Sequence, residues 1–261
     1  MKYGFIGCGN MGGAIAKALS KATHDVMLSD RSGKAKLLAE DLGFCYGSTQ
    51  NVATNCDRIF LAVKPQMMKD VLAPLGAVLR ERKPMIITIA AGLTIKQIED
   101  MIGSTLPIIR MMPNTPVAVG CGMTQYCCND LVDKELLDSF LADMHYCGTL
   151  DPLDERLIDS ASALSGCGPA YMYMFIEAMA DGAVACGVPR AKAIEYAAVT
   201  MAGAAQMVLQ TGMHPGTLKD AVCSPGGSTI EGLKALEEHG FRGAVMDCIT
   251  AAYKRSLELG K

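Results

Sequence analysis

The chain has 261 residues, of which 50% are apolar and 20% are charged, and its formal net charge is −3. This composition predicts a well-packed protein of one large domain or two modest ones, and it excludes a disordered chain. The charge gives no basic surface, so we expect no nucleic-acid partner. No apolar run is long enough to span a bilayer, and the most apolar helical stretch carries Glu177 and Asp181.

The start of the chain and its cysteines indicate a cytoplasmic protein. The opening MKYGFIG lacks the apolar core of a signal peptide, because Gly7 and Gly9 interrupt it. The 11 cysteines are scattered and none forms a CxxC pair, so the spacing of a zinc site or a redox motif is missing. We therefore expect reduced, mostly buried thiols, no metal and a cytoplasmic location.

From residue 1 to about residue 150, short apolar runs alternate with helical patterns. The predicted strands are Lys2–Ile6, Asp25–Ser29, Arg58–Val63, Met85–Ile89 and Ile108–Met112. The predicted helices are Met11–Lys21, Lys34–Asp41, Met67–Leu79, Ile95–Met101 and, between the later strands GCGMTQYC and HYCGTL, about Leu131–Met144. Continuous apolar strands with helical crossovers predict a parallel sheet that is covered on both faces.

After about residue 155 the pattern is helical only. The predicted helices are Glu155–Leu164, Pro169–Cys186, Arg190–Thr211, Thr217–Val222, Thr229–His239 and Ala244–Leu259. The run AAVTMAGAAQMVL has small residues on nearly every face, so other helices should enclose it, including those of a second subunit. This favours a dimerisation domain over a monomeric helical cap, and we predict two domains, residues 1–155 and 156–261.

The segment GFIGCGNMG places a glycine-rich turn between the first predicted strand and the first predicted helix. Gly7, Gly9 and Gly12 complete a GxGxxG pattern, which in this context is typical of dinucleotide-binding sites. The first glycine allows the tight turn, the second lets a pyrophosphate approach, and the third lets the helix pack closely. We predict cofactor binding, through the free amides of the helix start, by Gly7, Cys8, Gly9, Asn10 and Met11.

The choice of coenzyme depends on the end of the second strand, VMLSDRSGK. Asp30 could accept hydrogen bonds from the ribose 2′-hydroxyl of NAD. Arg31 and Ser32 could instead hold the 2′-phosphate of NADP while Asp30 turns aside. We predict that NADP(H) is preferred and that NAD(H) is possible, and an ordinary solvated turn is the alternative to both.

Further cofactor loops are expected where later strands end, because open α/β sheets bind ligands at the carboxyl ends of their strands. The loop LAVKPQ provides the cofactor-binding candidates Ala62, Val63, Lys64 and Pro65. The loop TIAAGLT provides Gly92. Asn114, in MMPNTPVAVGCG, could bond the carboxamide of a nicotinamide.

These segments, with ALSGCGPAY, HPGTLKD and SPGGSTIEGL further on, stand in the order seen in pyrroline-5-carboxylate reductases, and the chain resembles that family from Met1 to about Leu257. The resemblance implies an α/β Rossmann-like N-terminal domain and an all-α C-terminal dimerisation domain, with dimers that often assemble into decamers. It implies that the enzyme transfers a hydride from NAD(P)H to the C=N bond of 1-pyrroline-5-carboxylate, giving L-proline in the last step of proline biosynthesis.

Two positions depart from the family pattern. In GSTQNVATNCD, Thr49 stands where many relatives have Asn, so Ser48, Thr49 and Asn51 all remain candidates for the contact with adenosine. Asp30 stands where relatives have a neutral residue, which keeps the coenzyme choice open.

The stretch CSPGGSTIEG offers backbone and hydroxyl groups but no acid or base suited to proton transfer. A protonated imine is already electrophilic, so the enzyme has chiefly to hold the carboxylate and orient the ring. Ser228 and Glu231 have the spacing of a capping box, and the helix that follows should favour an anion. The predicted substrate-binding residues are Ser224, Gly226, Gly227, Ser228 and Thr229. We predict that the Thr229 hydroxyl is the catalytic group at the imine nitrogen, and the resemblance points to the same residue.

Other interpretations remain open. A β-hydroxyacid dehydrogenase also joins such a sheet to helices, but it needs a Lys or His general acid, and neither Lys192 nor Lys219 lies in a glycine-rich motif. A non-catalytic dinucleotide sensor would not need SPGGST, and an ordinary Pro-Gly turn before a capped helix is the structural alternative for that stretch. We interpret Cys167 as a packing residue and the four histidines as surface or capping residues.

Overall fold

The structure, a computed structural model, describes residues 1–259, with side chains up to residue 258. It forms two compact units, which are described separately. The N-terminal unit comprises Met1–Cys167 with the end of the chain from Ala252, and the helical unit comprises Gly168–Ala251. This division follows spatial contacts, and the domain boundary expected at residues 155–156 stays a prediction.

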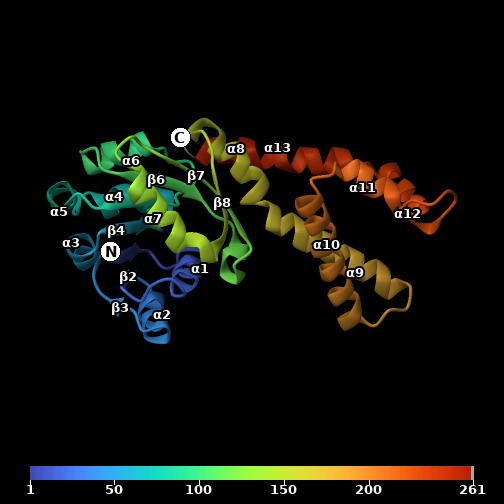
Figure 1. Ribbon diagram of the computed structural model, residues 1–261, viewed down its shortest axis with the longest axis horizontal. Coiled ribbons are helices and arrows are strands. Elements are labelled where there is room, and N and C mark those ends of the chain that lie inside the picture. Colours follow the sequence, from blue (N-terminus) through green and yellow to red (C-terminus); the bar gives the residue numbers. More distant parts are fainter. Residues whose placement is uncertain (260–261) are drawn as a thin grey trace. The chain divides into compact units, whose positions relative to one another are not determined.

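The N-terminal unit is built on one sheet of eight strands in the order β3-β2-β1-β4-β5-β6-β7-β8 (Figure 1). The strands are β1 (Tyr3–Ile6), β2 (Val26–Ser29), β3 (Cys45–Tyr46), β4 (Arg58–Leu61), β5 (Met85–Thr88), β6 (Ile108–Met112), β7 (Gly122–Cys128) and β8 (Gly148–Pro152). Strands β1 to β6 run parallel, whereas β7 is antiparallel to β6. Only the short η2 (Thr115–Val119) joins β6 to β7, and a parallel pair would need a longer crossover. The five strands expected in the parallel sheet are parallel here, and the two later strands, β7 and β8, pair parallel with each other and run opposite to the rest.

Helices cover both faces of this sheet. They are α1 (Asn10–Leu19), α2 (Lys34–Leu42), α3 (Thr49–Asn55), α4 (Met68–Leu72), α5 (Gly76–Arg82), α6 (Ile95–Ile102), α7 (Lys134–Met144) and α8 (Glu155–Ser165), with the 3-10 turns η1 (Pro65–Met67) and η3 (His145–Cys147). In β1, Tyr3 and Phe5 pack with residues of α1, α2 and α7. Ile6 instead packs with residues of α3, α4, α5 and α6. Because side chains alternate along a strand, one short strand supplies two separate cores.

Two helices differ from the sequence-based prediction. The single helix expected over Met67–Leu79 is interrupted near Pro74, because proline lacks a backbone N–H and clashes with the preceding turn. Helix α3 lies within GSTQNVATNCD, for which we predicted no helix, and it begins with a capping box formed by Ser48 and Asn51. It buries Val52 against the sheet, although most of its residues are polar.

A charged cluster lies buried beneath β4. Arg58, which is 2% exposed, donates hydrogen bonds to the Tyr3 hydroxyl at 2.5 Å, to the Asp143 carboxylate at 2.9 Å and to the Ser139 hydroxyl. The Tyr3 hydroxyl donates to Asp143 at 2.7 Å. Burial, and then the hydrogen bond to Asp143, raise the pKa of Tyr3 above its ordinary value, so the phenol stays protonated. The cluster joins β1, β4 and α7.

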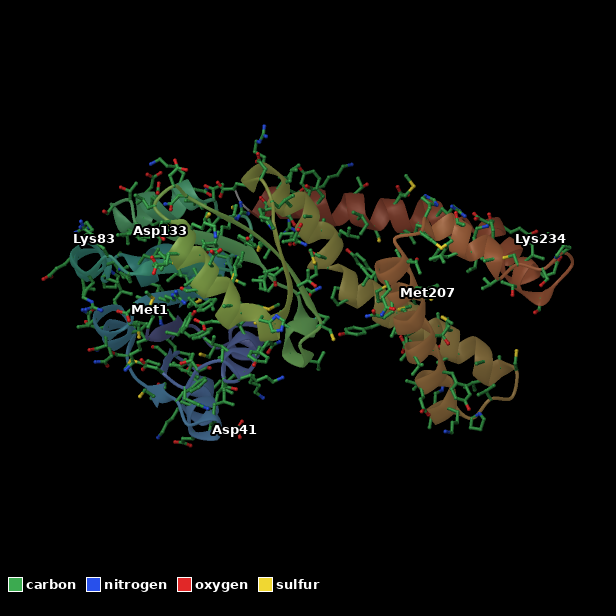
Figure 2. All side chains as sticks on the ribbon, in the orientation of Figure 1. Met1, Asp41, Lys83, Asp133, Met207 and Lys234 are labelled. Atoms are coloured by element: carbon green, nitrogen blue, oxygen red, sulfur yellow. The ribbon has the colours of Figure 1, made fainter. Side chains whose placement is uncertain are left out.

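The helical unit contains α9 (Gly168–Ala185), α10 (Arg190–Thr211), α11 (Pro215–Ala221), α12 (Ser228–Glu238) and most of α13 (Phe241–Leu259). Helices α9 and α10 pack against each other, and the residues that they bury are alanines. Large apolar side chains stand exposed instead, including Met207 of α10, which Figure 2 labels. Within residues 1–259, no helix combines the length and the apolar character that crossing a membrane requires.

Candidate functional site

The glycine loop between β1 and α1 brings three chain segments into close contact. Gly7 has φ of +102°, a conformation that side chains rarely adopt, and a Cβ added there would lie 2.6 Å from the Ala62 carbonyl oxygen. A Cβ on Gly12 would lie 2.6 Å from the Gly7 carbonyl oxygen and 2.9 Å from the Ala62 Cβ. Gly7 and Gly12 therefore let the start of α1 pack tightly against the ends of β1 and β4.

Gly9 has a different function in this loop. It is the N-cap of α1, no side chain caps the helix, and a Cβ at this position would meet no atom within 4 Å. The first intrahelical bond runs from the Gly13 amide to the Gly9 carbonyl, so the amides of Asn10, Met11 and Gly12 precede the helical ladder. The loop thus fits the pyrophosphate of a dinucleotide, because open space and unpaired N–H groups coincide at a helix start.

Cys8 contributes to the loop through its backbone. Its side chain is buried, and this burial, followed by the charge of Asp30, raises the pKa of the thiol to about 12. The side chain is therefore a neutral packing group at physiological pH.

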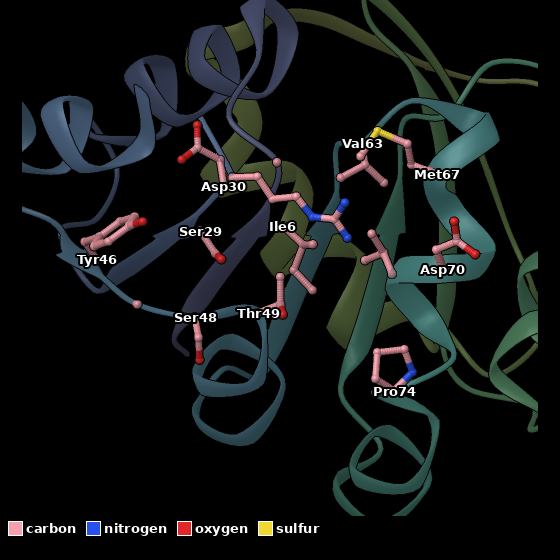
Figure 3. Close-up of a pocket in the computed structure, with 14 residues that line it drawn as sticks. Ile6, Ser29, Asp30, Tyr46, Ser48, Thr49, Val63, Met67, Asp70 and Pro74 are labelled. Atoms are coloured by element: carbon pink, nitrogen blue, oxygen red, sulfur yellow. The ribbon is translucent and has the colours of Figure 1, made fainter. Parts of the chain in front are cut away.

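A cavity of about 550 Å³ lies beside this loop at the carboxyl ends of β1, β2 and β4 (Figure 3). Of the residues that we predicted to bind cofactor, it is lined by Gly7, Asp30, Arg31 and Val63. Its other lining residues are Ile6, Ser29, Tyr46, Gly47, Ser48, Thr49, Met67, Asp70, Val71 and Pro74. The last four of these come from the segment between β4 and α5, and no sequence pattern indicated that this segment lies near the second strand.

The carboxylate of Asp30 is turned back onto its own chain. Its Oδ2 accepts a hydrogen bond from the Ser32 hydroxyl at 2.5 Å, and its Oδ1 accepts one from the Gly33 amide at 3.1 Å. Figure 3 shows this carboxylate directed away from Thr49, Asp70 and Pro74. Within residues 1–259, Arg31 forms no ion pair or hydrogen bond, and it lines the cavity as an exposed cation.

The three candidates for the adenosine contact differ in what they already bind. Asn51 Oδ1 accepts hydrogen bonds from the Ser48 amide at 3.0 Å and from the Ser48 hydroxyl at 2.7 Å. Asn51 does not line the cavity, whereas Ser48 and Thr49 do. In the part of the chain that the structure describes, the Thr49 hydroxyl has no hydrogen-bond partner. Thr49 is therefore the candidate best prepared to bond a ligand.

The remaining predicted cofactor residues follow the ends of β4, β5 and β6, but they do not line this cavity. Ala62 pairs with β1 through a bond to the Ile6 carbonyl, and Lys64 is exposed at the start of η1 before Pro65. Gly92 has φ of +74° in the loop after β5. Their contacts with a cofactor stay predictions.

Asn114 is held inside the N-terminal unit. Its side chain donates to the Ser165 carbonyl at 3.0 Å and accepts from the Met123 amide at 2.9 Å, and it is 8% exposed. These two bonds fix the loop after β6, so any contact with a nicotinamide would use the remaining donor or acceptor capacity of the amide.

In the helical unit, the SPGG segment forms a tight turn that leads into α12. The Gly227 amide donates to the Ser224 carbonyl at 3.0 Å, and Gly226 has φ of +68°. Proline at the second position and a glycine with positive φ at the third are typical of a type II turn. The Gly227 amide therefore closes the turn, and the amides that remain open to a ligand lie further along the chain.

The capping box expected from Ser228 and Glu231 is not formed. Gly227, with extended φ and ψ of −78° and 168°, is the N-cap, and no side chain caps the helix. Ser228 is already helical, so its hydroxyl cannot take the position of a cap. The first intrahelical bond runs from the Glu231 amide to the Gly227 carbonyl, which leaves the amides of Ser228, Thr229 and Ile230 at an uncapped helix start.

The predicted substrate residues Ser224, Gly226, Ser228 and Thr229 are all exposed in this unit, and Gly227 is partly exposed. Their hydroxyl and amide groups surround one turn and one helix start, which is an arrangement that can bind a carboxylate. Within residues 1–259, no group of three or more His, Cys, Asp or Glu residues is placed to hold a metal ion.

With this glycine loop, this cavity and this sheet, the N-terminal unit is that of a Rossmann-type dinucleotide-binding protein. The chain belongs to the pyrroline-5-carboxylate reductase family, since it is 43% identical over 266 residues to the pyrroline-5-carboxylate reductase of Escherichia coli K12, with 100% of this chain and 98% of the relative covered. It is 38% identical over 261 residues to the enzyme of the same name from Pisum sativum, with 98% and 95% covered.

Family profiles and solved structures agree with this assignment. Residues 155–259 match the family described as pyrroline-5-carboxylate reductase dimerisation, and residues 2–92 match the one described as NADP oxidoreductase, coenzyme F420-dependent. The crystal structure of Plasmodium falciparum pyrroline carboxylate reductase with NADP bound superimposes with a TM-score of 0.91 at 34% identity, covering 100% of this chain and 98% of that one. The predicted family and fold class are confirmed.

Proposed function

We propose that this protein is an NAD(P)H-dependent oxidoreductase that reduces 1-pyrroline-5-carboxylate to L-proline, the last step of proline biosynthesis. The observation that carries the proposal is the identity of 43% to a pyrroline-5-carboxylate reductase along the whole chain. The geometry supports it at both ends of the sequence, in the glycine loop before α1 and in the uncapped start of α12.

The helical unit supplies the substrate groups. Ser224 and the amides of Ser228 and Thr229 hold the carboxylate, which the dipole of α12 favours. The Thr229 hydroxyl hydrogen-bonds the imine nitrogen and so fixes the ring relative to its carboxylate. No side chain has to deliver a proton during the transfer, because the protonated imine is already electrophilic. The bound nicotinamide supplies the hydride to the imine carbon.

The N-terminal unit supplies the coenzyme groups, and NADP(H) is the preferred coenzyme. The free Arg31 guanidinium beside the cavity and the turned-back Asp30 carboxylate support this preference, and a similar enzyme was crystallised with NADP bound. NAD(H) can bind the same glycine loop, since the helix start beside Gly9 serves the pyrophosphate, which the two coenzymes share.

The protein acts as a homodimer assembled into a decamer, in the cytoplasm. The match of residues 155–259 to a dimerisation family and the exposed apolar side chains of α9 and α10 support self-association through the helical unit. All eleven cysteines stand as free thiols, which is the state that a reducing compartment maintains. The match of residues 155–259 supports a domain boundary at residues 155–156.

The decisive experiment compares Thr229→Val with wild type and with Thr217→Val. Valine keeps the shape of threonine but removes the hydroxyl, and Thr217 is an exposed residue of α11 outside the SPGG segment. We expect Thr229→Val to lower kcat with 1-pyrroline-5-carboxylate by roughly tenfold to a hundredfold, the loss of one hydrogen bond to a charged group. Thr217→Val should match wild type. Turnover of Thr229→Val at the wild-type rate would refute the role of the hydroxyl.

A further inference from the structure

Asp30 lines the cavity, but its carboxylate oxygens bond to the chain that follows it. Both of its oxygens accept hydrogen bonds from residues two and three positions ahead, the Ser32 hydroxyl at 2.5 Å and the Gly33 amide at 3.1 Å. Gly33, with φ of +79°, is the N-cap of α2. The acidic side chain thus spans the connection from β2 to α2, and residue 31 lies within the loop that it closes.

An acid after the second strand would select NAD only if it faced the ribose. In NAD-selective sites of this fold, the carboxylate accepts hydrogen bonds from the 2′-hydroxyl. The Asp30 carboxylate points away from the cavity residues Thr49, Asp70 and Pro74 (Figure 3). In this conformation both carboxylate oxygens already accept hydrogen bonds from the 30–33 turn, so the carboxylate is not directed across the cavity.

The same turn leaves the neighbouring cation without a partner. Arg31 lines the cavity and forms no ion pair within residues 1–259, although a carboxylate stands next to it in sequence. Ser32 and Gly33 direct the two Asp30 oxygens into the turn, and no ion pair joins this carboxylate to the Arg31 guanidinium. A guanidinium without a partner can offer two parallel N–H donors to a phosphate, which is a strong, charge-assisted pairing.

The negative charge of Asp30 also acts on groups outside the turn. The charge of Asp30 reaches the glycine loop, where it contributes to the raised pKa of Cys8. The first turn of α2 contains no acid and carries Lys34 and Lys36. The contacts that the structure gives this carboxylate are the two hydrogen bonds of the turn.

We propose that Asp30 is a specificity-determining residue that favours NADP(H), because its carboxylate closes the 30–33 turn and keeps Arg31 free beside the cavity. This role rests on the proposed function of the N-terminal unit as an NADP(H) site. It is a positioning role, since Asp30 acts on the 2′-phosphate through Arg31.

Asp30→Ala and Asp30→Asn should differ in their affinity for a 2′-phosphate. Alanine removes both hydrogen bonds of the turn, whereas asparagine keeps an acceptor for the Gly33 amide and can donate to the Ser32 hydroxyl. The full-length protein would be titrated calorimetrically with 2′,5′-ADP and with ADP, which differ only in the 2′-phosphate. Arg31→Ala serves as the reference for complete loss of the phosphate contact. Asp41→Ala is the control for charge alone, because it removes an exposed carboxylate from α2, the helix that follows the turn.

We expect Asp30→Ala to weaken 2′,5′-ADP by about fivefold to tenfold, corresponding to about one ordinary hydrogen bond, and to change ADP by less than about twofold. Asp30→Asn and Asp41→Ala should stay within about twofold of wild type for both ligands. Ser32→Ala, which removes one of the two bonds at an exposed residue, should fall between wild type and Asp30→Ala. With NADPH and NADH as substrates, the KM for NADPH should rise in Asp30→Ala while kcat stays unchanged.

Three results would overturn the proposal. If Asp30→Ala weakens ADP and leaves or strengthens 2′,5′-ADP, then Asp30 binds the ribose. If both ligands weaken equally, the turn only supports the fold. If neither ligand changes and Ser32→Ala also matches wild type, the turn does not govern Arg31. The titrations need no imine, so a wild type that binds 2′,5′-ADP but does not reduce 1-pyrroline-5-carboxylate would refute the proposed activity and leave this test intact.

Discussion

The two units bury their apolar side chains very differently. The N-terminal unit encloses two cores, one on each face of its sheet, and its large side chains such as Phe5 and Phe60 are fully buried and stacked at 4.4 Å. In the helical unit the buried residues of α9 and α10 are alanines, while Leu209 is 76% exposed and Met246 is 70% exposed. The N-terminal unit buries its large apolar side chains within one chain. The helical unit leaves them exposed, which is typical of a surface that binds another protein chain.

The largest expected effect is on assembly. Leu209→Asp places a charge on the exposed apolar surface of α10, and Leu37→Asp makes the same change at a leucine of α2 that is 69% exposed. Because an unpaired charge in an interface costs several kcal/mol, Leu209→Asp should convert an oligomer into monomers, whereas Leu37→Asp should not. Light scattering on a sizing column measures both masses. An unchanged mass for Leu209→Asp would remove Leu209 from the interface.

The second prediction compares two ion pairs, one from each unit. Arg58→Ala should lower the free energy of unfolding by about 3 kcal/mol, because it leaves Asp143 and Tyr3 without their buried partner. Arg190→Ala removes an exposed pair with Asp181 and should cost less than about 1 kcal/mol. Urea unfolding at one protein concentration measures the difference. Equal losses would show that the exposed pair becomes buried when subunits associate.

A third comparison uses glycines within helices. Gly12→Ala should weaken NADPH binding more than about tenfold and destabilise the N-terminal unit by about 2 kcal/mol, since its Cβ would overlap the Gly7 carbonyl. Gly203→Ala in α10 meets no atom within 4 Å, so helix propensity alone should raise stability by up to about 1 kcal/mol. Thermal unfolding and a NADPH titration report the two effects. A destabilised Gly203→Ala would place a neighbouring subunit close to that residue.

The smallest effect concerns thiol reactivity at pH 8. The thiolate is the reactive form, and a pKa raised to about 12 leaves only about one Cys8 side chain in ten thousand ionised. Cys8 should therefore resist iodoacetamide in the folded protein, while the exposed Cys186 of the helical unit reacts. Peptide mass spectrometry gives the rates, with the denatured protein as the control in which all eleven react. Rapid labelling of Cys8 would contradict its burial.

The sequence predicted the elements that packing determines and missed those that local chemistry determines. Strands such as Ile108–Met112 are buried along their whole length and so appear as continuous apolar runs. The two residues of β3 are both exposed, and α3 depends on a capping box and two buried side chains, so neither produced a hydrophobic pattern. The spacing of Ser48 and Asn51, which suits a capping box, could have indicated α3. Pro74 could have indicated the break between α4 and α5.

The candidate site divides in the same way. The three glycines of the first loop could be assigned from their spacing, because a side chain at Gly7 or Gly12 would overlap the backbone and Gly9 leaves open space at the helix start. The orientation of the Asp30 carboxylate could not be assigned from the sequence, since it can face a ribose or its own chain. The positions of Ser32 and Gly33 in the folded turn determine which of the two occurs. Asp70 and Val71 reach the cavity through tertiary folding alone. The spacing of Ser228 and Glu231 predicted a capping box, but no side chain caps α12.

The uncapped start of α12 connects the order of its first turn to the binding of a carboxylate. Without a side-chain acceptor, the first turn of α12 frays more readily in the empty enzyme than it would with a serine at residue 227. A bound carboxylate would supply the missing acceptor, so amide hydrogen exchange at residues 228–230 should slow when proline is added. The enzyme would then sense its occupant through the order of a single helical turn.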